Sequence, residues 1–196
     1  MINSSRVLPY SKVLQAILDF TTRIFHGQGV SAAILTEDQG YWIGVSGYSE
    51  SGKPVDKNML FNIGSIGKNL LATIILQLAE EGRLSLNDTL AKWALGSPTI
   101  DENINIRQLL NHTSGIFDWV AHPQSPFSIP YRQIDYGRAW TQPEILNLLH
   151  GKPYFPPGNG WHYSTTNYNL LKIIAEKVTG TTLQLRSKNV SCYHWF

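Results

Sequence analysis

Residues 61–82 read FNIGSIGKNLLATIILQLAEEG, a mostly apolar stretch in which Ser65 opens the run and Gly82 closes it. Apolar residues occupy almost every face of a helix drawn over this stretch, and a glycine often follows the last helical residue. The pattern predicts a helix over residues 65–81 that is buried on most sides. Lys68 falls in its first turn, where a solvated lysine would need a polar surface. We therefore expect Lys68 to be buried for a functional reason.

Ser65 and Lys68 form an S-x-x-K pair, whose spacing puts both side chains on one helix face about one turn apart. A serine hydroxyl is a weak nucleophile until a base takes its proton, and a lysine can be that base. A helix N-terminus also favours the oxyanion that forms when a serine attacks a carbonyl. The motif is short enough to arise by chance, with Ser65 then a plain helix cap, but a buried lysine favours nucleophilic catalysis.

The remaining elements indicate an α+β fold. Residues 11–25 carry apolar side chains at helical spacing and predict an amphipathic helix. Two β-branched and aromatic runs, 30–35 and 41–45, flank a polar turn that ends in a glycine, which predicts a β-hairpin. Further helices follow, and Gly180 ends the last of them.

Several ordered motifs carry a family resemblance. The S-x-x-K segment is followed by LAEEGRL at 78–84, IRQLLNHTSG at 106–115, PPG at 156–158 and YSTTNY at 163–168. Together they resemble the class C branch of the serine beta-lactamase and penicillin-binding protein (DD-peptidase) superfamily, from about residue 27 to about residue 185. The resemblance implies an α+β, beta-lactamase/transpeptidase-like fold, with a helical subdomain and the first hairpin of an antiparallel sheet.

The resemblance also implies roles for two further residues. Tyr163 matches the tyrosine of the family's Tyr-x-Asn motif, which lies beside the nucleophile and the lysine as an acid/base group. Thr165 stands where the family has the asparagine that holds the substrate amide. We therefore expect Thr165 at the substrate-binding position, with esterase-like chemistry more plausible than in relatives with asparagine. Asn167 lies two residues too late to replace that asparagine simply. The segment around His112 is structural in the family.

The family's third motif, Lys-Thr-Gly or His-x-Gly on a later strand, is absent from the sequence, as are the remaining strands. That strand supplies the second oxyanion donor in family members. We therefore expect residues 1–185 to be the N-terminal part of such a domain, with helix and hairpin in 11–50 and a helical region in 61–182. Residues 186–196 do not resemble the family and are expected to be an irregular tail, which indicates a truncation or a shifted reading frame.

Composition limits the partners. The chain has 196 residues, of which 42% are hydrophobic and 15% charged, so it can bury a core. Its net charge of +2 is small and scattered, which excludes nucleic acid as an expected partner. A single cysteine, Cys192, and six scattered histidines build no metal site, and we expect no cofactor. No apolar run reaches the length of a membrane span, and no secretory signal is visible, so the cytoplasm is the default location, although the family is often exported.

The sequence thus predicts a serine hydrolase that forms an acyl-enzyme on Ser65. Its substrate would be a small molecule or peptide with a lactam, ester or D-alanyl peptide carbonyl. The alternative is a catalytically impaired or inactive remnant that acts at most as a binding module, which the absent third motif supports. The incomplete sheet leaves an unpaired edge and favours self-association.

Overall fold

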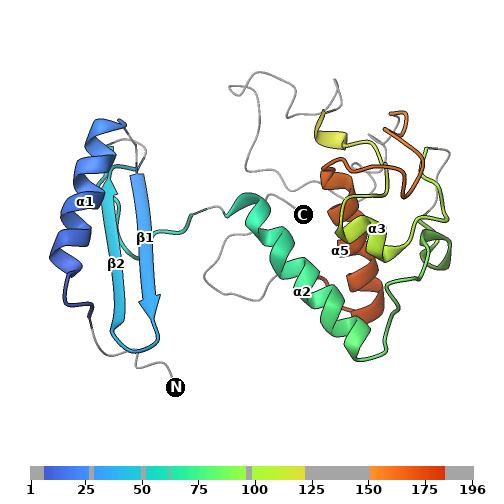
Figure 1. Cartoon of the computed structure of the whole chain (residues 1–196), viewed down its shortest axis with the longest axis horizontal. Helices are drawn as coiled ribbons and strands as arrows, with labels where there is room; N and C mark the ends of the chain where they lie inside the picture. Colours follow the sequence, from blue (N-terminus) through green and yellow to red (C-terminus); the bar gives the residue numbers. More distant parts are fainter. Residues whose placement is uncertain are drawn as a thin grey trace. The chain divides into compact units, whose positions relative to one another are not determined.

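The computed structural model describes residues 7–26, 29–49, 52–61, 63–95, 99–121 and 151–183. The chain divides into two compact units, Met1–Leu60 and Phe61–Phe196, each described below by itself (Figure 1). Within the described parts, no helix has the length and apolar character that crossing a bilayer requires. The expected tail at 186–196 lies outside the described residues.

The first unit contains helix α1 (Ser11–Ile24) and an antiparallel hairpin of strands β1 (Gly29–Thr36) and β2 (Gly40–Gly47). The helix runs alongside the hairpin (Figure 1), and the Gln15 side-chain amide donates a hydrogen bond of 3.0 Å to the Val45 carbonyl. The predicted first helix and hairpin are therefore confirmed.

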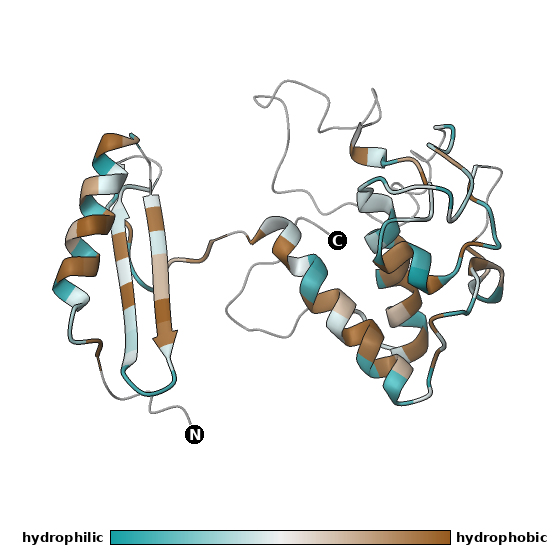
Figure 2. Ribbon diagram, in the orientation of Figure 1, coloured by the Kyte–Doolittle hydropathy of each residue, from teal (hydrophilic) through white to brown (hydrophobic). Residues whose placement is uncertain are grey.

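The apolar residues of α1 do not all face the hairpin. Val13, Ile17, Phe20 and Ile24 form an apolar stripe at helical spacing and are at least half exposed. Figure 2 shows apolar residues along this helix as brown segments. The expected self-association through this incomplete part of the fold stays a prediction.

The second unit is helical in its described parts. A 3-10 turn, η2 (Gly64–Ile66), leads into α2 (Gly67–Glu80), and the short α3 (Ile106–Leu110) lies between the 3-10 turns η3 (Leu90–Trp93) and η4 (Trp119–Ala121). The last helix, α5 (Thr165–Thr179), packs against α2, α3 and η4 (Figure 1). Its central side chains are fully buried, so α5 is the core helix of this unit. They include Leu170, Leu171, Ile174 and Ala175.

Helix α2 differs from its prediction in burial. Its buried residues form one stripe, Gly67, Lys68, Leu71, Ile75 and Leu78, whereas Leu70 and Leu76 on other faces are exposed. Burial on most sides was therefore wrong: apolar composition does not show how many faces have neighbours.

The end of α2 follows the prediction. Gly82 has a φ of 70°, and its N–H bonds back to the carbonyl of Ala79. The N–H of Arg83 bonds to the carbonyl of Leu78. These two bonds form a Schellman motif, which favours glycine at the left-handed position.

Candidate active site

Ser65 lies in η2, at the entrance to α2, and its side chain is exposed. Lys68 lies one turn later and is only 6% exposed. The Lys68 Nζ atom donates a hydrogen bond of 3.1 Å to Ser65 Oγ. The predicted burial of Lys68 and its position next to Ser65 are both confirmed.

Tyr163 reaches the same serine from the segment that precedes α5. Its phenolic oxygen lies 2.9 Å from Ser65 Oγ. Lys68 Nζ lies 5.3 Å from the centre of the Tyr163 ring and 5.9 Å from the centre of the Tyr168 ring. The three residues predicted to be catalytic thus meet at one oxygen atom, Ser65 Oγ.

The environment of Tyr163 lowers the pKa of its phenol. Burial raises the pKa of the phenol, but hydrogen bonds from Lys68 and Ser65, the positive charge of Lys68 and a hydrogen bond from Thr165 lower it. The lowering causes outweigh burial, so the pKa lies below the ordinary value of 10.0. A phenol with a lowered pKa is better suited to accept and return a proton near neutral pH.

A loop after α3 holds the segment that carries Tyr163. The carbonyl oxygen of Phe117 accepts hydrogen bonds from the hydroxyls of Thr166 at 2.8 Å and Ser164 at 3.4 Å. Asp118 Oδ1 accepts the backbone N–H of Thr165 at 3.1 Å. The bond to Asp118 satisfies an N–H at the start of α5, where helical N–H donors have no partner within the helix, and the two hydroxyl bonds tie the same segment to Phe117.

Asp118 was not among the residues selected from sequence. It is buried, and its Oδ1 also accepts the backbone N–H of Val120 at 3.2 Å. Burial raises the pKa of this carboxyl, and it outweighs the two backbone hydrogen bonds and the charges of Lys68 and His162, which lower it. A lone aspartate in a loop offers no sequence signal for this role, because its partners lie far away in the chain.

A second set of bonds links the 112–115 loop to α5. Asn167 is fully buried, and its Oδ1 accepts the Ser114 hydroxyl at 2.6 Å. Its Nδ2 lies 3.1 Å from His112 Nδ1, which also accepts the backbone N–H of Ser164 at 3.2 Å. The Asn167 amide is therefore committed to this internal network.

Thr165 is buried at the first position of α5. A hydrogen bond from its hydroxyl helps to lower the pKa of the Tyr163 phenol, and its backbone N–H donates to Asp118 Oδ1. A substrate contact through Thr165 stays a prediction.

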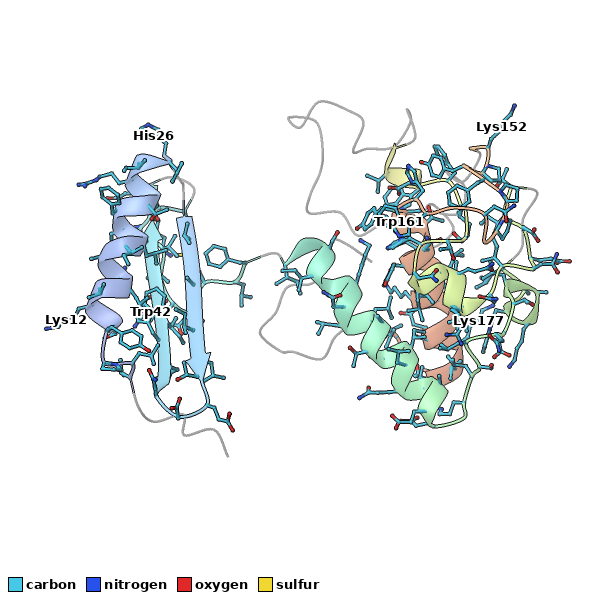
Figure 3. All side chains as sticks on the ribbon, in the orientation of Figure 1. Lys12, His26, Trp42, Lys152, Trp161 and Lys177 are labelled. Atoms are coloured by element: carbon cyan, nitrogen blue, oxygen red, sulfur yellow. The ribbon has the colours of Figure 1, made fainter. Side chains whose placement is uncertain are left out.

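The segment that leads to Tyr163 carries several aromatic side chains. The rings of Tyr154 and His162 stack with their centroids 3.7 Å apart. Trp161, labelled in Figure 3, is 66% exposed, and Tyr163 is 38% exposed. Ser65 and Tyr163 are therefore accessible to a molecule from solvent. In the described part of the chain, no group of three or more His, Cys, Asp or Glu residues could hold a metal ion.

Comparisons with known proteins identify the family of this chain. The Beta-lactamase family profile matches residues 21–185. A penicillin-binding protein of Bacillus subtilis (strain 168) is 34% identical over 139 residues, which are 68% of this chain and 29% of that protein. Esterase EstB of Burkholderia gladioli is 29% identical over 148 residues, 68% of this chain and 36% of the esterase.

Solved structures give the same result. The D-stereospecific amidohydrolase from Streptomyces sp. is 32% identical with a TM-score of 0.67, covering 88% of this chain and 49% of that one. The D-amino acid amidase from Ochrobactrum anthropi SV3, complexed with D-phenylalanine, is 29% identical with a TM-score of 0.71, covering 87% and 46%. The chain thus spans about a third of these curated relatives and about half of these structures. It belongs to the beta-lactamase family, in the class C-related branch of serine hydrolases.

Proposed function

We propose that this chain carries the acylation centre of a serine hydrolase, with Ser65 as nucleophile and Lys68 and Tyr163 as its acid/base groups. One observation carries the proposal: Ser65 Oγ lies within hydrogen-bond distance of both Lys68 Nζ, at 3.1 Å, and the Tyr163 hydroxyl, at 2.9 Å. A nucleophile bonded to a base, with a further group orienting them, is the arrangement that activates a hydroxyl.

The proposed reaction has two halves. Ser65 Oγ forms a bond to the substrate carbonyl carbon, and its proton passes to the Lys68–Tyr163 pair. The tetrahedral oxyanion then collapses, the bond to the leaving nitrogen or oxygen breaks, and the pair returns the proton to that atom. Water hydrolyses the resulting ester on Ser65 and restores the hydroxyl. The amino end of α2 carries a positive dipole end, which favours the oxyanion.

The substrate class is proposed from chemistry and relatives together. Lactams, esters, D-alanyl peptides and D-amino acid amides all present a carbonyl with a leaving group that needs a proton. Relatives named as a penicillin-binding protein, an esterase and a D-amino acid amidase support this set. Thr165 at the family's asparagine position is proposed to favour ester substrates, since it offers a hydroxyl instead of an amide.

A covalent label tests the proposal. A fluorophosphonate and a fluorescent penicillin would be incubated with the chain and with the Ser65→Ala variant, and the adduct located by peptide mass spectrometry. We expect the adduct on Ser65 alone, because Ser114 and Ser164 are buried and already hydrogen-bonded. An adduct on either of those serines contradicts the assignment. Absence of any adduct favours the alternative, a catalytically impaired chain that acts at most as a binding module.

A further inference from the structure

We propose that His112 is a positioning residue, whose neutral imidazole and left-handed backbone hold Tyr163 against Ser65. The inference rests on the proposed function, because it gives His112 a part in the reaction that Ser65 and Tyr163 would perform. The family profile and the relatives' names assign no role to this histidine.

His112 contacts three consecutive residues of the segment that carries Tyr163. Its carbonyl oxygen accepts the backbone N–H of His162 at 3.1 Å. Its ring lies 4.7 Å, centre to centre, from the ring of Tyr163, with 33° between the ring planes. Its Nδ1 accepts the backbone N–H of Ser164 at 3.2 Å. The residue before Tyr163, Tyr163 itself and the residue after it are thus all held by one side chain and its carbonyl.

The contact with Ser164 determines the tautomer of His112. A backbone N–H can only donate, so Nδ1 must be unprotonated, and the proton of the neutral ring lies on Nε2. Asn167 Nδ2 lies 3.1 Å from the same nitrogen, and its Oδ1 is already occupied by the Ser114 hydroxyl. Two N–H donors therefore converge on His112 Nδ1. Only a neutral imidazole has a lone pair on that nitrogen to accept them.

The backbone of His112 is unusual as well. Its φ is 61°, in the left-handed region, which is uncommon for residues other than glycine, although asparagine, aspartate and histidine are enriched there. Strained backbone of this kind persists where surrounding contacts over-determine it, and it gathers at functional sites. At this position it accompanies a side chain and a carbonyl that both engage the 162–164 segment.

Protonation would disable this arrangement. The titratable groups that face the ring are Lys68 of α2, His162 and Tyr163 of the preceding segment, and Tyr168 of α5. Burial lowers the pKa of His112, and the positive charges of Lys68 and His162 lower it further from its ordinary value of 6.5. The ring therefore stays neutral at neutral pH. As the pH falls below 6.5 and through the lowered pKa, Nδ1 gains a proton and both donors lose their acceptor.

Two substitutions separate the imidazole from the backbone. His112→Asn keeps an acceptor at the position of Nδ1 and tolerates a left-handed φ, but it cannot titrate. His112→Gly tolerates the same φ without strain and offers neither acceptor nor ring. Because both variants tolerate this φ, backbone strain cannot explain a difference between them. Urea unfolding shows whether each variant is folded.

The first measurement requires no activity. The ultraviolet absorbance of each protein is titrated with and without the additional substitution Tyr163→Phe. The difference between the two titrations gives the pKa of the Tyr163 phenol. We expect H112G to raise the pKa of Tyr163 toward 10.0, because the phenol moves away from Lys68 and Ser65, and H112N to restore most of the lowering. A Tyr163 pKa in H112G that equals the wild-type pKa overturns the proposal. So does a Tyr163 pKa that is the same in H112N and H112G.

The second measurement is the rate of fluorophosphonate labelling between pH 5 and pH 8. H112G should label about 10- to 10²-fold more slowly than wild type at pH 7.5, the loss typical of a slightly misplaced group. Protonation of the Lys68–Tyr163 pair should slow labelling in every variant as the pH falls. Wild type should show an additional loss below pH 6.5 that H112N lacks, whereas a His162→Asn control should keep the additional loss. The same pH profile in wild type and H112N overturns the proposal.

Nitrogen NMR of the wild-type chain provides a test that no variant's folding can obscure. At pH 7.5 the His112 ring must carry its proton on Nε2, and a protonated Nδ1 overturns the proposal. If wild type is not labelled but the His112 tautomer and the Tyr163 titration are as expected, the proposed function is wrong and the positioning role is supported.

Discussion

The hydroxyl oxygens of Ser65 and Tyr163 lie 2.9 Å apart, although 98 residues separate the two in the sequence. Lys68 Nζ donates to the same Ser65 oxygen at 3.1 Å. Ser65 Oγ thus lies beside two candidate acid/base groups, one close in sequence and one brought near by the fold. Substitutions at the two positions can tell which of them removes the serine proton.

We expect Lys68→Ala to abolish labelling of Ser65 more completely than Tyr163→Phe. The lysine amine is buried and bonded directly to the nucleophile, and loss of a general base lowers rates by about 10²–10⁴. Second-order labelling rates with a fluorophosphonate at a single pH provide the comparison. Equal losses, or a larger loss in Y163F, would move the base role to Tyr163.

Lys68→Met should raise the pKa of Tyr163. The substitution removes a hydrogen bond and a positive charge that favour the phenolate, and it leaves burial, which favours the phenol. Ultraviolet titration, with Tyr163→Phe in the same background as the blank, measures the change. Lys152→Met removes an exposed lysine of the same unit and should leave the titration unchanged. A Tyr163 pKa that is equal in K68M and wild type would show that Lys68 does not tune the phenol.

Asp118→Ala should destabilise the second unit by about 1–3 kcal/mol, because the N–H groups of Val120 and Thr165 lose their buried acceptor. Asp118→Asn should cost less, since its amide oxygen can accept both bonds. Urea unfolding followed by tryptophan fluorescence gives both values. Equal destabilisation by the two variants would show that the charge, and not the acceptor, matters.

The contribution of Asp118 to the free energy of unfolding depends on pH. Burial raises the pKa of Asp118 in the folded state, so the folded chain takes up the proton more readily than the unfolded chain. The resulting stability is fully present below the ordinary pKa of 3.8 and is lost as the pH rises through the raised value. Wild type should therefore gain stability relative to D118N as the pH falls toward 4. The opposite trend would mean that the carboxyl is stabilised as an anion.

Gly115→Ala and Gly180→Ala form a matched pair, since the two glycines have φ values of 72° and 70°. A Cβ on Gly180 would meet no atom within 4 Å, whereas one on Gly115 would collide with the carbonyl oxygen of Phe155. We expect G180A to cost about 1–2 kcal/mol from its left-handed φ alone. G115A should cost about 1–3 kcal/mol more from the collision. Equal free energies of unfolding for the two variants would contradict the close packing at Gly115.

We also expect the 196-residue chain to turn over poorly even where Ser65 is acylated. The sequence holds no Lys-Thr-Gly or His-x-Gly motif after Tyr163, and losing one oxyanion donor costs about 10²–10³ in kcat in other hydrolases. Steady-state hydrolysis of a chromogenic cephalosporin and a p-nitrophenyl ester, with Ser65→Ala as control, measures this. A Ser65-dependent kcat in the ordinary range of about 1–10³ s⁻¹ would show that the absent motif is dispensable.

The sequence by itself was sufficient for features that depend on neighbouring residues. The hairpin of β1 and β2 follows from two β-branched and aromatic runs around a polar turn that ends in Gly40, and the end of α2 follows from Gly82. The meeting of Ser65 and Lys68 also needs only local geometry, because three residues make about one helical turn. The assignment of Tyr163 to the same site came from family resemblance, and the fold confirms that Tyr163 lies beside Ser65.

Only the tertiary structure decided which groups support that site. Asp118 and His112 act through backbone N–H groups of Thr165 and Ser164, and a backbone donor leaves no mark in a sequence. Burial is decided in the same way: α2 is apolar on many faces, but its buried residues form one stripe that includes Lys68, and α2 packs against α5. The pKa shifts of Tyr163 and Asp118 depend on burial and on charges brought close from distant segments, because electrostatic interactions follow distance in space and not position along the chain.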